Sequence, residues 1–458
     1  MRQNYFFACA LLPGGWRRGV RVEVDAGLIR QVSENAAPEP GDQCEALVVP
    51  GLPNLHSHAF QRALAGLTER RGPAGADDFW SWRKAMYGFL EQLEADDIEA
   101  IAAYAYADML EAGFTSVAEF HYLHRTTQGT LYENPAELAL RHLAAAETTG
   151  IGVTVLPVFY EAGNFGGVPP SSGQSRFVTD LETFADIVAR VRAHAAIGPA
   201  QHVGIGIHSL RAVTGPHIAQ LLRQYPQSNL HIHAAEQIRE VNDCVNFTGL
   251  RPVEWLLRNT DMNERWCVVH ATHLTAAETS GLAQSGAVAG LCPVTEANLG
   301  DGIFPGIAYQ EATGRWGIGT DSNVSLDAAG ELRQLEYSQR LGAQARNSLA
   351  SEARPSTGRA LYEAALHGGA QALGQALGAI DRGHRADFIV LDATHPDLVG
   401  RTGDVLLDTW IFTGSRSFIR RVIAHGHTVV EAGRHRGRER IDARYVRLMT
   451  RLMNTRPA

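Results

Sequence analysis

Hydrophobic and polar positions change their pattern twice along this chain. Apolar runs are short in residues 1–50, and residues 20–24 alternate valine with charged side chains. From position 46 onward, apolar runs alternate with Ala- and Leu-rich segments of helical length, such as 94–112 and 135–148. The first pattern predicts short strands with turns. The second predicts a parallel sheet with helices outside it, because strand and helix alternate.

Eight apolar runs of the middle region each end in polar residues. Their ends lie at or near His58, Glu119–Tyr122, Tyr160, His208, His233–Glu236, His270, Pro293–Asn298 and Asp321. Eight strand–helix units over this length of chain predict an α/β protein with a (β/α)8 barrel of the TIM type. The active site of such a barrel lies at the carboxyl ends of its strands, which is where the histidines and acids of this chain are placed.

The C-terminal part returns to the pattern of short strands. A helix is predicted at 359–373, and the segments 386–392 and 421–430 resemble hairpin strands. Because the N-terminal strands are equally short, the simplest architecture joins both chain ends in one small β-sandwich.

This organisation divides the chain into three units. Residues 1–48 and 376–433 are expected to form the β-sandwich, and residues 49–375 the barrel. Residues 434–458 are rich in arginine and place apolar side chains at helical spacing. They predict a helical tail on the surface.

The composition limits the classes of partner. The chain has 458 residues, of which 45% are hydrophobic, and a formal net charge of −8. This charge gives no electrostatic reason to expect a nucleic acid or an anionic membrane as partner. No stretch approaches the ~20 apolar residues of a transmembrane helix. The five cysteines form no Cys-x-x-Cys pair, which is typical of reduced thiols, and we expect a soluble cytoplasmic protein.

The pair His56 and His58 follows the apolar run 46–50. Side chains alternate faces along a strand, so two histidines one residue apart point the same way. Two imidazoles at the end of a buried strand provide half of a metal site. A coincidental pair of polar side chains on a half-exposed strand is the alternative.

The other ligands are sought at the ends of later strands. His231 and His233 share a face, so either can be the third ligand. We choose His233 because it lies nearer the carboxyl end of its strand and has Glu236 three residues further on, and we expect His231 to be hydrogen-bonded inside the barrel wall. Asp321 supplies a carboxylate that can bind the metal and accept a proton from its water.

Two further residues are candidates for proton transfer. Glu236 can act as a general acid and base, although an acid early in a helix also interacts favourably with the helix dipole. His270 can orient or polarise the attacking water, where the alternative is a structural histidine. The strands that end near Tyr160 and His208 offer no lysine for a group bridging two metals. We therefore expect one divalent metal ion per chain, with Zn²⁺ as the ion that suits these ligands best.

These residues lie in motifs that resemble the amidohydrolase superfamily, in its mononuclear deaminase branch. The motifs are Asn54-Leu55-His56-Ser57-His58, His233-Ala234-Ala235-Glu236, Val269-His270 and Thr320-Asp321-Ser322. A closer similarity, to members that hydrolyse a formimino amino acid, covers essentially the whole chain. It is carried by residues 56–63, 79–87, 118–122, 208–213 and 295–305. One position departs from this group, which often has histidine after Asp-Ser where this chain has Asn323.

The resemblance implies a hydrolase acting on the linear amidine C–N bond of N-formimino-L-glutamate, an intermediate of histidine degradation. The expected products are N-formyl-L-glutamate and ammonia, with Glu236 as the proton shuttle. The resemblance also implies a homodimer and a substrate pocket lined by Gln61, Arg83, Tyr122, His208 and Arg211. Two arginines suit a substrate with two carboxylates, because a guanidinium binds a carboxylate through two hydrogen bonds.

Three alternatives stay open. A mononuclear zinc deaminase of a heterocycle such as guanine or a pterin is the nearest, but a neutral ring favours aromatic stacking and amide contacts over paired arginines. A two-metal hydrolase of a cyclic amide is disfavoured by the missing lysine. An inactive barrel that serves as a scaffold is disfavoured because every expected ligand type and Glu236 are present.

Overall fold

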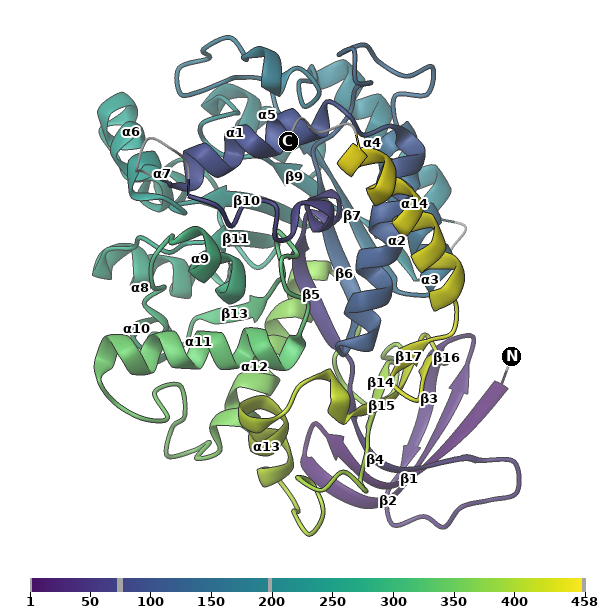
Figure 1. Ribbon diagram of the computed structural model, residues 1–458. Helices are drawn as coiled ribbons and strands as arrows, with labels where there is room; N and C mark the ends of the chain where they lie inside the picture. Colours follow the sequence, from purple (N-terminus) through teal and green to yellow (C-terminus); the bar gives the residue numbers. More distant parts are fainter. Residues whose placement is uncertain (1, 72–76, 197–199, 455–458) are drawn as a thin grey trace.

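The computed structural model describes residues 2–71, 77–196 and 200–454, in which two sheets and their helices form the molecule (Figure 1). Residue 1 and residues 455–458, at the outer ends of the predicted first and last units, lie outside the described residues. None of the helices within the described ranges has both the length and the apolar character needed to cross a membrane.

The first sheet is a parallel barrel. Its strands are β5 (Leu52–Ser57), β6 (Phe114–His121), β7 (Gly152–Phe159), β9 (Ile205–Ile207), β10 (Leu230–Ala234), β11 (Trp266–His270), β12 (Val288–Leu291) and β13 (Arg315–Ile318). Each pairs in parallel with the next, and β8 (Gln201–Val203) pairs with β7 outside this path. A parallel bridge between Ser57 and Asp321 brings the first strand to the end of the last one. Each predicted strand end lies at or within a few residues of the end of one of these strands, although the seventh, Pro293–Asn298, falls in a helix that follows β12. The predicted (β/α)8 fold is confirmed.

Helices surround the barrel (Figure 1). They are α1 (Phe79–Leu90), α2 (Ala95–Glu111), α3 (Glu137–Thr149), α4 (Leu181–Ala195), α5 (Gly215–Gln224), α6 (Ile238–Thr248), α7 (Pro252–Asn259), α8 (Ala276–Ser285), α9 (Pro293–Leu299), α10 (Gly306–Glu311), α11 (Ala328–Ala343) and α12 (Thr357–Leu373), with the short 3-10 turns η1 (Ala59–Leu64) and η2 (Ser172–Gln174). The carbonyl oxygens of Ala372 and Leu373 accept hydrogen bonds from His231 and Thr154. The last turn of α12 therefore contacts the strands on the side opposite their carboxyl ends.

Strands from both chain ends form the second sheet, as predicted. Its order is β17 (Arg434–His435), β16 (His427–Glu431), β15 (Ile419–Ala424), β14 (Phe388–Leu391), β4 (Gln43–Pro50), β1 (Arg2–Leu12), β2 (Gly15–Asp25) and β3 (Leu28–Ser33). We expected a sandwich, and the structure joins all these strands in one mixed sheet. The reason is that β4 pairs in parallel with β1 and antiparallel with β14.

The second sheet has a core of its own. The ring of Phe388 packs edge-on against those of Tyr5 and Phe7, at centroid distances of 5.5 and 5.2 Å. This core is separate from the large core of the barrel. Burying aromatic rings from both chain ends stabilises the pairing of β4 with β1 and β14.

The chain then passes through α13 (Val405–Thr413), η3 (Arg416–Phe418) and, after β17, α14 (Arg438–Asn454). The helix α14, yellow in Figure 1, lies along α2, and the rings of Tyr104 and Tyr445 stack at 3.9 Å. A surface helix is thus present in the predicted tail, although Arg434–His435 still belong to the sheet. The residue limits of the three predicted units stay a prediction.

Candidate metal centre and active-site pocket

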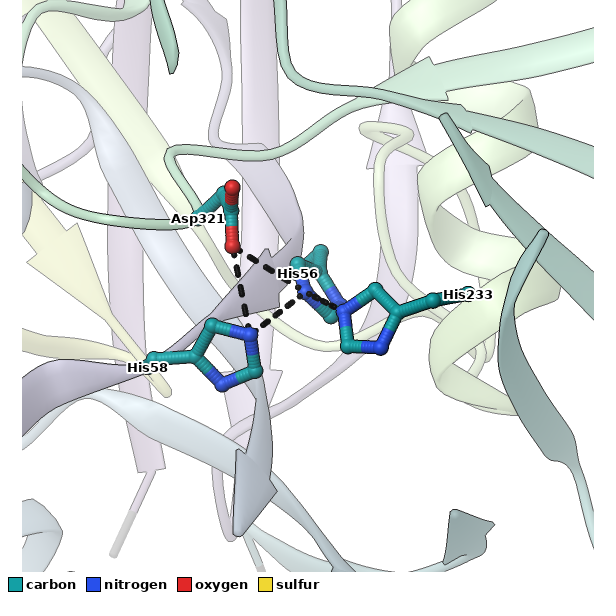
Figure 2. A group of neighbouring side chains, drawn as sticks. All are labelled: His56, His58, His233 and Asp321. Atoms are coloured by element: carbon teal, nitrogen blue, oxygen red, sulfur yellow. Dashed lines mark hydrogen bonds and ion pairs between the residues drawn. The ribbon is translucent and has the colours of Figure 1, made fainter. Parts of the chain in front are cut away.

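Four side chains from three strands converge at the carboxyl end of the barrel (Figure 2). Nε2 of His56 lies 3.2 Å from Nε2 of His58 and 3.0 Å from Nε2 of His233. Oδ1 of Asp321 lies 3.4 Å from Nε2 of His56 and 3.2 Å from Nε2 of His58. One ligand atom from each of the four lies within 4.8 Å of the others, and all four are buried. The structure therefore brings together the four residues predicted as ligands.

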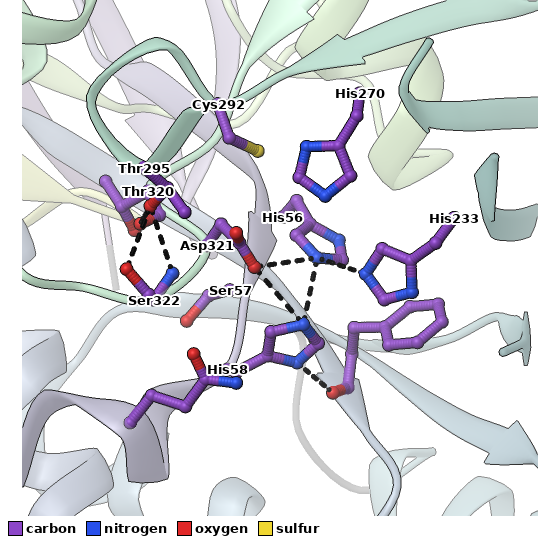
Figure 3. A network of polar contacts seen from close by, with 12 residues as sticks. His56, Ser57, His58, His233, His270, Cys292, Thr295, Thr320, Asp321 and Ser322 are labelled. Atoms are coloured by element: carbon purple, nitrogen blue, oxygen red, sulfur yellow. Dashed lines mark hydrogen bonds and ion pairs between the residues drawn. The ribbon is translucent and has the colours of Figure 1, made fainter. Parts of the chain in front are cut away.

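The turn after β13 fixes the position of Asp321. The amide of Asp321 donates to the carbonyl of His56, and both Asp321 and Asn323 have a positive φ, of 45° and 56°. The buried amide group of Asn323 donates to the carbonyl of His58 at 3.0 Å and to Oγ of Ser57 at 3.2 Å. Asn323 thus ties the aspartate turn to the segment that carries both histidines. Figure 3 labels Ser57 and His58 of this segment and Asp321 of the turn.

The hydrogen bonds around the imidazoles leave Nε2 available as a ligand. Nδ1 of His58 lies 2.9 Å from the carbonyl of Phe120, and Nδ1 of His233 lies 3.1 Å from the carbonyl of His208. A carbonyl only accepts, so each Nδ1 carries the proton and each Nε2 presents a lone pair. The partner of a metal-bound histidine is commonly a carbonyl of this kind.

The electrostatics of the four residues also fit a metal ion. Burial lowers the pKa of His56 to about 3, and burial likewise lowers the pKa of His58 and of His233. Burial by itself raises the pKa of Asp321, but the imidazoles of His56 and His58 beside it bring it below its ordinary value. Neutral imidazoles and an ionised carboxylate are the protonation states that metal ligands need. Three nitrogens and one oxygen form a donor set suited to a catalytic zinc site.

His231 does not belong to this cluster. Its Nε2 lies 2.9 Å from the carbonyl of Ala372 in α12, and the side chain is fully buried. His231 therefore makes the hydrogen bond inside the barrel that the sequence suggested, and His233 is the histidine at the metal cluster.

A pocket opens beside the cluster. It is lined by His58, Gln61, Phe79, Trp82, Arg83, Met86, Tyr122, His208, Arg211, His233, Glu236, His270, Leu299 and Asp321. The structure brings all five predicted substrate-binding residues into this one pocket. Their roles stay a prediction.

Helix α1 supplies one wall of the pocket. The carboxylate of Asp78 accepts hydrogen bonds from the amides of Trp80 and Ser81 and so caps the start of the helix. From this helix Phe79, Trp82 and Arg83 face the pocket.

Two arginines line the same pocket as the metal cluster. The guanidinium groups of Arg83 and Arg211 lie 5.6 and 5.7 Å from the ring of Trp80. Arg83 also donates to the hydroxyl of Tyr160 at 3.3 Å. Arg211 is 6% exposed, and its Nε has no hydrogen-bond partner among the residues that the structure describes. A buried cation with an unpaired donor suits an anionic ligand.

Glu236 and His270 line the pocket together with members of the metal cluster. Nε2 of His270 is 3.7 Å from Oε1 of Glu236, and both side chains are buried. Burial raises the pKa of Glu236 to about 7. Burial by itself lowers the pKa of His270, but the carboxylates of Glu236 and Glu296 raise it well above its ordinary value. Carboxyl and imidazole groups with pKa values shifted in this way are typical of proton transfer sites.

Three carboxylates that are buried near the site were not predicted as site residues from the sequence. Glu119 accepts from the amide of Ala59 at 2.7 Å and from the hydroxyl of Tyr106 at 3.2 Å. Glu296 and Asp301 lie behind His270 and Glu236, in the segment after β12. Their position after a strand was visible in the sequence, but no spacing rule connects them with His270.

Comparisons with known proteins agree with this geometry. The sequence model of the amidohydrolase family matches residues 47–429. The formimidoylglutamate deiminase of Pseudomonas aeruginosa is 48% identical over 448 residues, which cover 97% of this chain and 98% of that protein. The crystal structure of an amidohydrolase from Brucella melitensis superposes with a TM-score of 0.94, at 46% identity over 98% of this chain and all of that one.

A more distant structure shares the fold. It is an adenosine deaminase from Xanthomonas campestris with bound zinc, with a TM-score of 0.81 and 21% identity over 99% of each chain.

Proposed function

The chain belongs to the amidohydrolase family, and on this basis we propose that it is a formimidoylglutamate deiminase. The reaction is the metal-dependent hydrolysis of N-formimino-L-glutamate to N-formyl-L-glutamate and ammonia, a step of histidine degradation. Water adds to the formimino carbon, the bond from this carbon to the terminal imine nitrogen breaks, and that nitrogen leaves as ammonia.

One observation carries the proposal. A single pocket is lined by three of the four clustered ligands, by Glu236 and His270, and by Arg83 and Arg211. The substrate has groups that suit both sets of residues, namely a hydrolysable formimino carbon and two carboxylates. The 48% identity with the deiminase of Pseudomonas aeruginosa over nearly the whole chain supports the same assignment.

One divalent ion, expected to be Zn²⁺, would be held by His56, His58, His233 and Asp321. When bound, such an ion acts as a Lewis acid and lowers the pKa of water toward neutrality. Three nitrogens and one carboxylate oxygen support zinc, and no lysine stands at the ends of β7 and β9 to bridge a second ion. The metal's identity and the count of one per chain belong to the proposal.

The protons are moved by residues of the chain. Asp321 accepts a proton from the attacking water, and His270 orients that water toward the formimino carbon. Glu236 donates a proton to the imine nitrogen, then takes up the proton of the hydroxyl group formed by the addition of water and passes it to the departing amine, so that the formyl C=O bond forms as ammonia leaves. The proton held by Asp321 then returns to Glu236. A carboxyl group whose pKa lies at about 7 can both accept and donate a proton near neutral pH.

The substrate is held by its carboxylates. Arg83 and Arg211 bind them, because two guanidinium groups in one pocket match two anionic groups. Gln61, Tyr122 and His208 complete this part of the pocket, where the amide of Gln61 donates to the hydroxyl of Tyr122 at 3.1 Å. A neutral heterocycle such as guanine or a pterin does not use two arginines in this way.

Ammonia release tests the proposal. Protein that is first stripped of metal with a chelator and then reloaded with Zn²⁺ is assayed with N-formimino-L-glutamate, guanine and a pterin. The proposal predicts turnover of the formimino compound alone, lost on stripping and restored on reloading. Release of ammonia from a heterocycle alone, or no metal-dependent release, contradicts it. A homodimer and a cytoplasmic location stay predictions.

A further inference from the structure

A buried carboxylate lies on the far side of His270 from the pocket. Oε1 of Glu296 is 3.3 Å from Nδ1 of His270 and accepts from the backbone amide of Cys292 at 2.8 Å. Glu296 is only 5% exposed and His270 only 1%. Nδ1 therefore faces Glu296, whereas Nε2, the other ring nitrogen, faces Glu236 at 3.7 Å.

The backbone at His270 does not follow ordinary strand geometry. His270 and the next residue, Ala271, have positive φ values of 69° and 49°. Left-handed conformations are unfavourable for residues with a Cβ and persist where surrounding contacts hold them. The backbone of this turn is held by the hydrogen bond from the amide of Ala271 to the carbonyl of Ala234, and Glu296 adds a contact to the imidazole itself.

Glu296 is itself held firmly. It lies in α9, where its amide donates to the carbonyl of Cys292 and its carbonyl accepts from the amide of Asp301, each at 2.9 Å. Its carboxylate accepts a hydrogen bond from the backbone amide of Cys292 in the same segment. Glu296 is thus held in one short segment by two backbone hydrogen bonds and one to its carboxylate, which fixes the oxygen that faces His270.

We propose that Glu296 is a positioning residue, which keeps a proton on Nδ1 of His270 and turns Nε2 toward Glu236 and the substrate. An ionised carboxylate only accepts hydrogen bonds, so the ring nitrogen that faces it carries the proton. Nε2 is then the atom available at the reacting carbon. Glu296 acts through His270 and has no contact with the pocket. The inference rests on the proposed function, since His270 is given its role there.

A set of variants tests the inference in steady-state kinetics. Glu296→Ala is expected to lower kcat about 10–100-fold, as loss of a partner that orients a site histidine commonly does, and to leave KM and metal content unchanged. Glu296→Gln is expected to restore most of kcat, because its amide oxygen can still accept from Nδ1 and from the amide of Cys292.

Glu331 offers a matched control. It is also fully buried, and it accepts from the amide of Val294 at 2.9 Å in the same segment. Glu331→Gln changes a carboxylate that supports this segment without contacting His270. An equal loss of kcat in Glu331→Gln and in Glu296→Ala means that the effect is structural and overturns the inference.

A double-variant cycle separates action through His270 from independent action. In a His270→Asn background, Glu296→Ala is expected to cost no further activity, since the residue it positions is gone. A further loss as large as the one in the wild-type background overturns the inference.

A measurement without substrate tests the positioning role of Glu296 independently of the proposed reaction. In protein labelled with ¹⁵N-histidine, the imidazole N–H resonance that His270→Asn removes is assigned to His270. We expect this Nδ1–H resonance to disappear in Glu296→Ala and to remain in Glu331→Gln. A resonance unchanged in Glu296→Ala overturns the inference even if ammonia is released. If ammonia is not released but the resonance depends on Glu296, the proposed function fails and the positioning role stands.

Discussion

Oε1 of Glu236 lies 3.7 Å from Nε2 of His270, and the two residues stand at the ends of the neighbouring parallel strands β10 and β11. Both side chains line the pocket, beside His233 and Asp321 of the metal cluster. This pair places two titratable groups beside the four predicted ligands. Substitutions of these groups and of the ligands therefore test the site.

Replacing Glu236 by glutamine removes the proposed proton shuttle and keeps the shape of the side chain. We expect kcat to fall about 10²–10⁴-fold, the usual contribution of a positioned acid or base. KM and the bound metal should change little, because Glu236 is not among the four clustered ligands. Steady-state kinetics and metal analysis of the same preparation check this, and a kcat near that of the wild type excludes Glu236 as the shuttle.

The two neighbouring histidines on β10 allow a matched test of the metal site. His233→Asn is expected to lose the bound metal on dialysis, because Nε2 of His233 is part of the cluster. The same change at His231 removes a hydrogen bond to Ala372 and should leave the metal in place. Elemental analysis after dialysis measures both. Loss of metal from the His231 variant alone reverses our assignment.

Arg211→Met tests the carboxylate subsite. Losing hydrogen bonds between a guanidinium and a carboxylate is expected to raise KM about 10–100-fold, which corresponds to about 1.5–3 kcal/mol. Arg239→Met is the control, because Arg239 lies 4.6 Å from the same Trp80 ring but does not line the pocket. Equal KM values for the Arg211 variant and the wild type contradict the subsite.

Asn323→Ala removes the amide that joins the aspartate turn to the histidine segment. The loss of its buried hydrogen bonds to Ser57 and His58 should lower the free energy of unfolding by about 1–3 kcal/mol. Metal affinity should fall about 10–100-fold, as for other groups that orient ligands. Urea unfolding and competition with a chelator measure the two effects. Unchanged metal affinity shows that Asn323 does not position Asp321.

The buried Glu119 makes the stability of the protein depend on pH. Burial raises its pKa from 4.5 to about 8. Between these two values the folded state binds more protons than the unfolded state, so this group lowers the free energy of unfolding as the pH rises. Glutamine cannot ionise and imitates the protonated acid. From pH 5 to pH 8, Glu119→Gln should therefore gain stability relative to the wild type, by up to about 1.4 kcal/mol per pH unit.

Urea unfolding of both proteins across this pH range gives the comparison. A stability difference between Glu119→Gln and the wild type that stays constant with pH shows that Glu119 does not titrate in this window.

The barrel was predictable because its strands are buried on all sides. Each of the eight strands is a short apolar run that ends in polar residues, and sequence order fixes which strands are neighbours in a parallel barrel. The second sheet was less predictable. Its two halves come from opposite chain ends, and nothing in the spacing of β4 shows that it pairs with both β1 and β14.

The candidate site was predictable where a ligand stands at a strand end. The histidines of β5 share a face because of strand geometry, and the choice of His233 over His231 follows from its distance to the strand end. Glu119 and Glu296 were not found, because each contacts a backbone amide or a side chain at the end of a neighbouring strand. Contacts between residues far apart in the sequence leave no periodic pattern in it.

The fate of the oxygen atom of water tests the central claim most directly. The metal-loaded protein is incubated with N-formimino-L-glutamate in H₂¹⁸O, and the products are analysed by mass spectrometry. We predict one equivalent of ammonia and N-formyl-L-glutamate with a single ¹⁸O on the formyl group. Glutamate with formamide as products, or turnover that does not depend on the metal, contradicts the account.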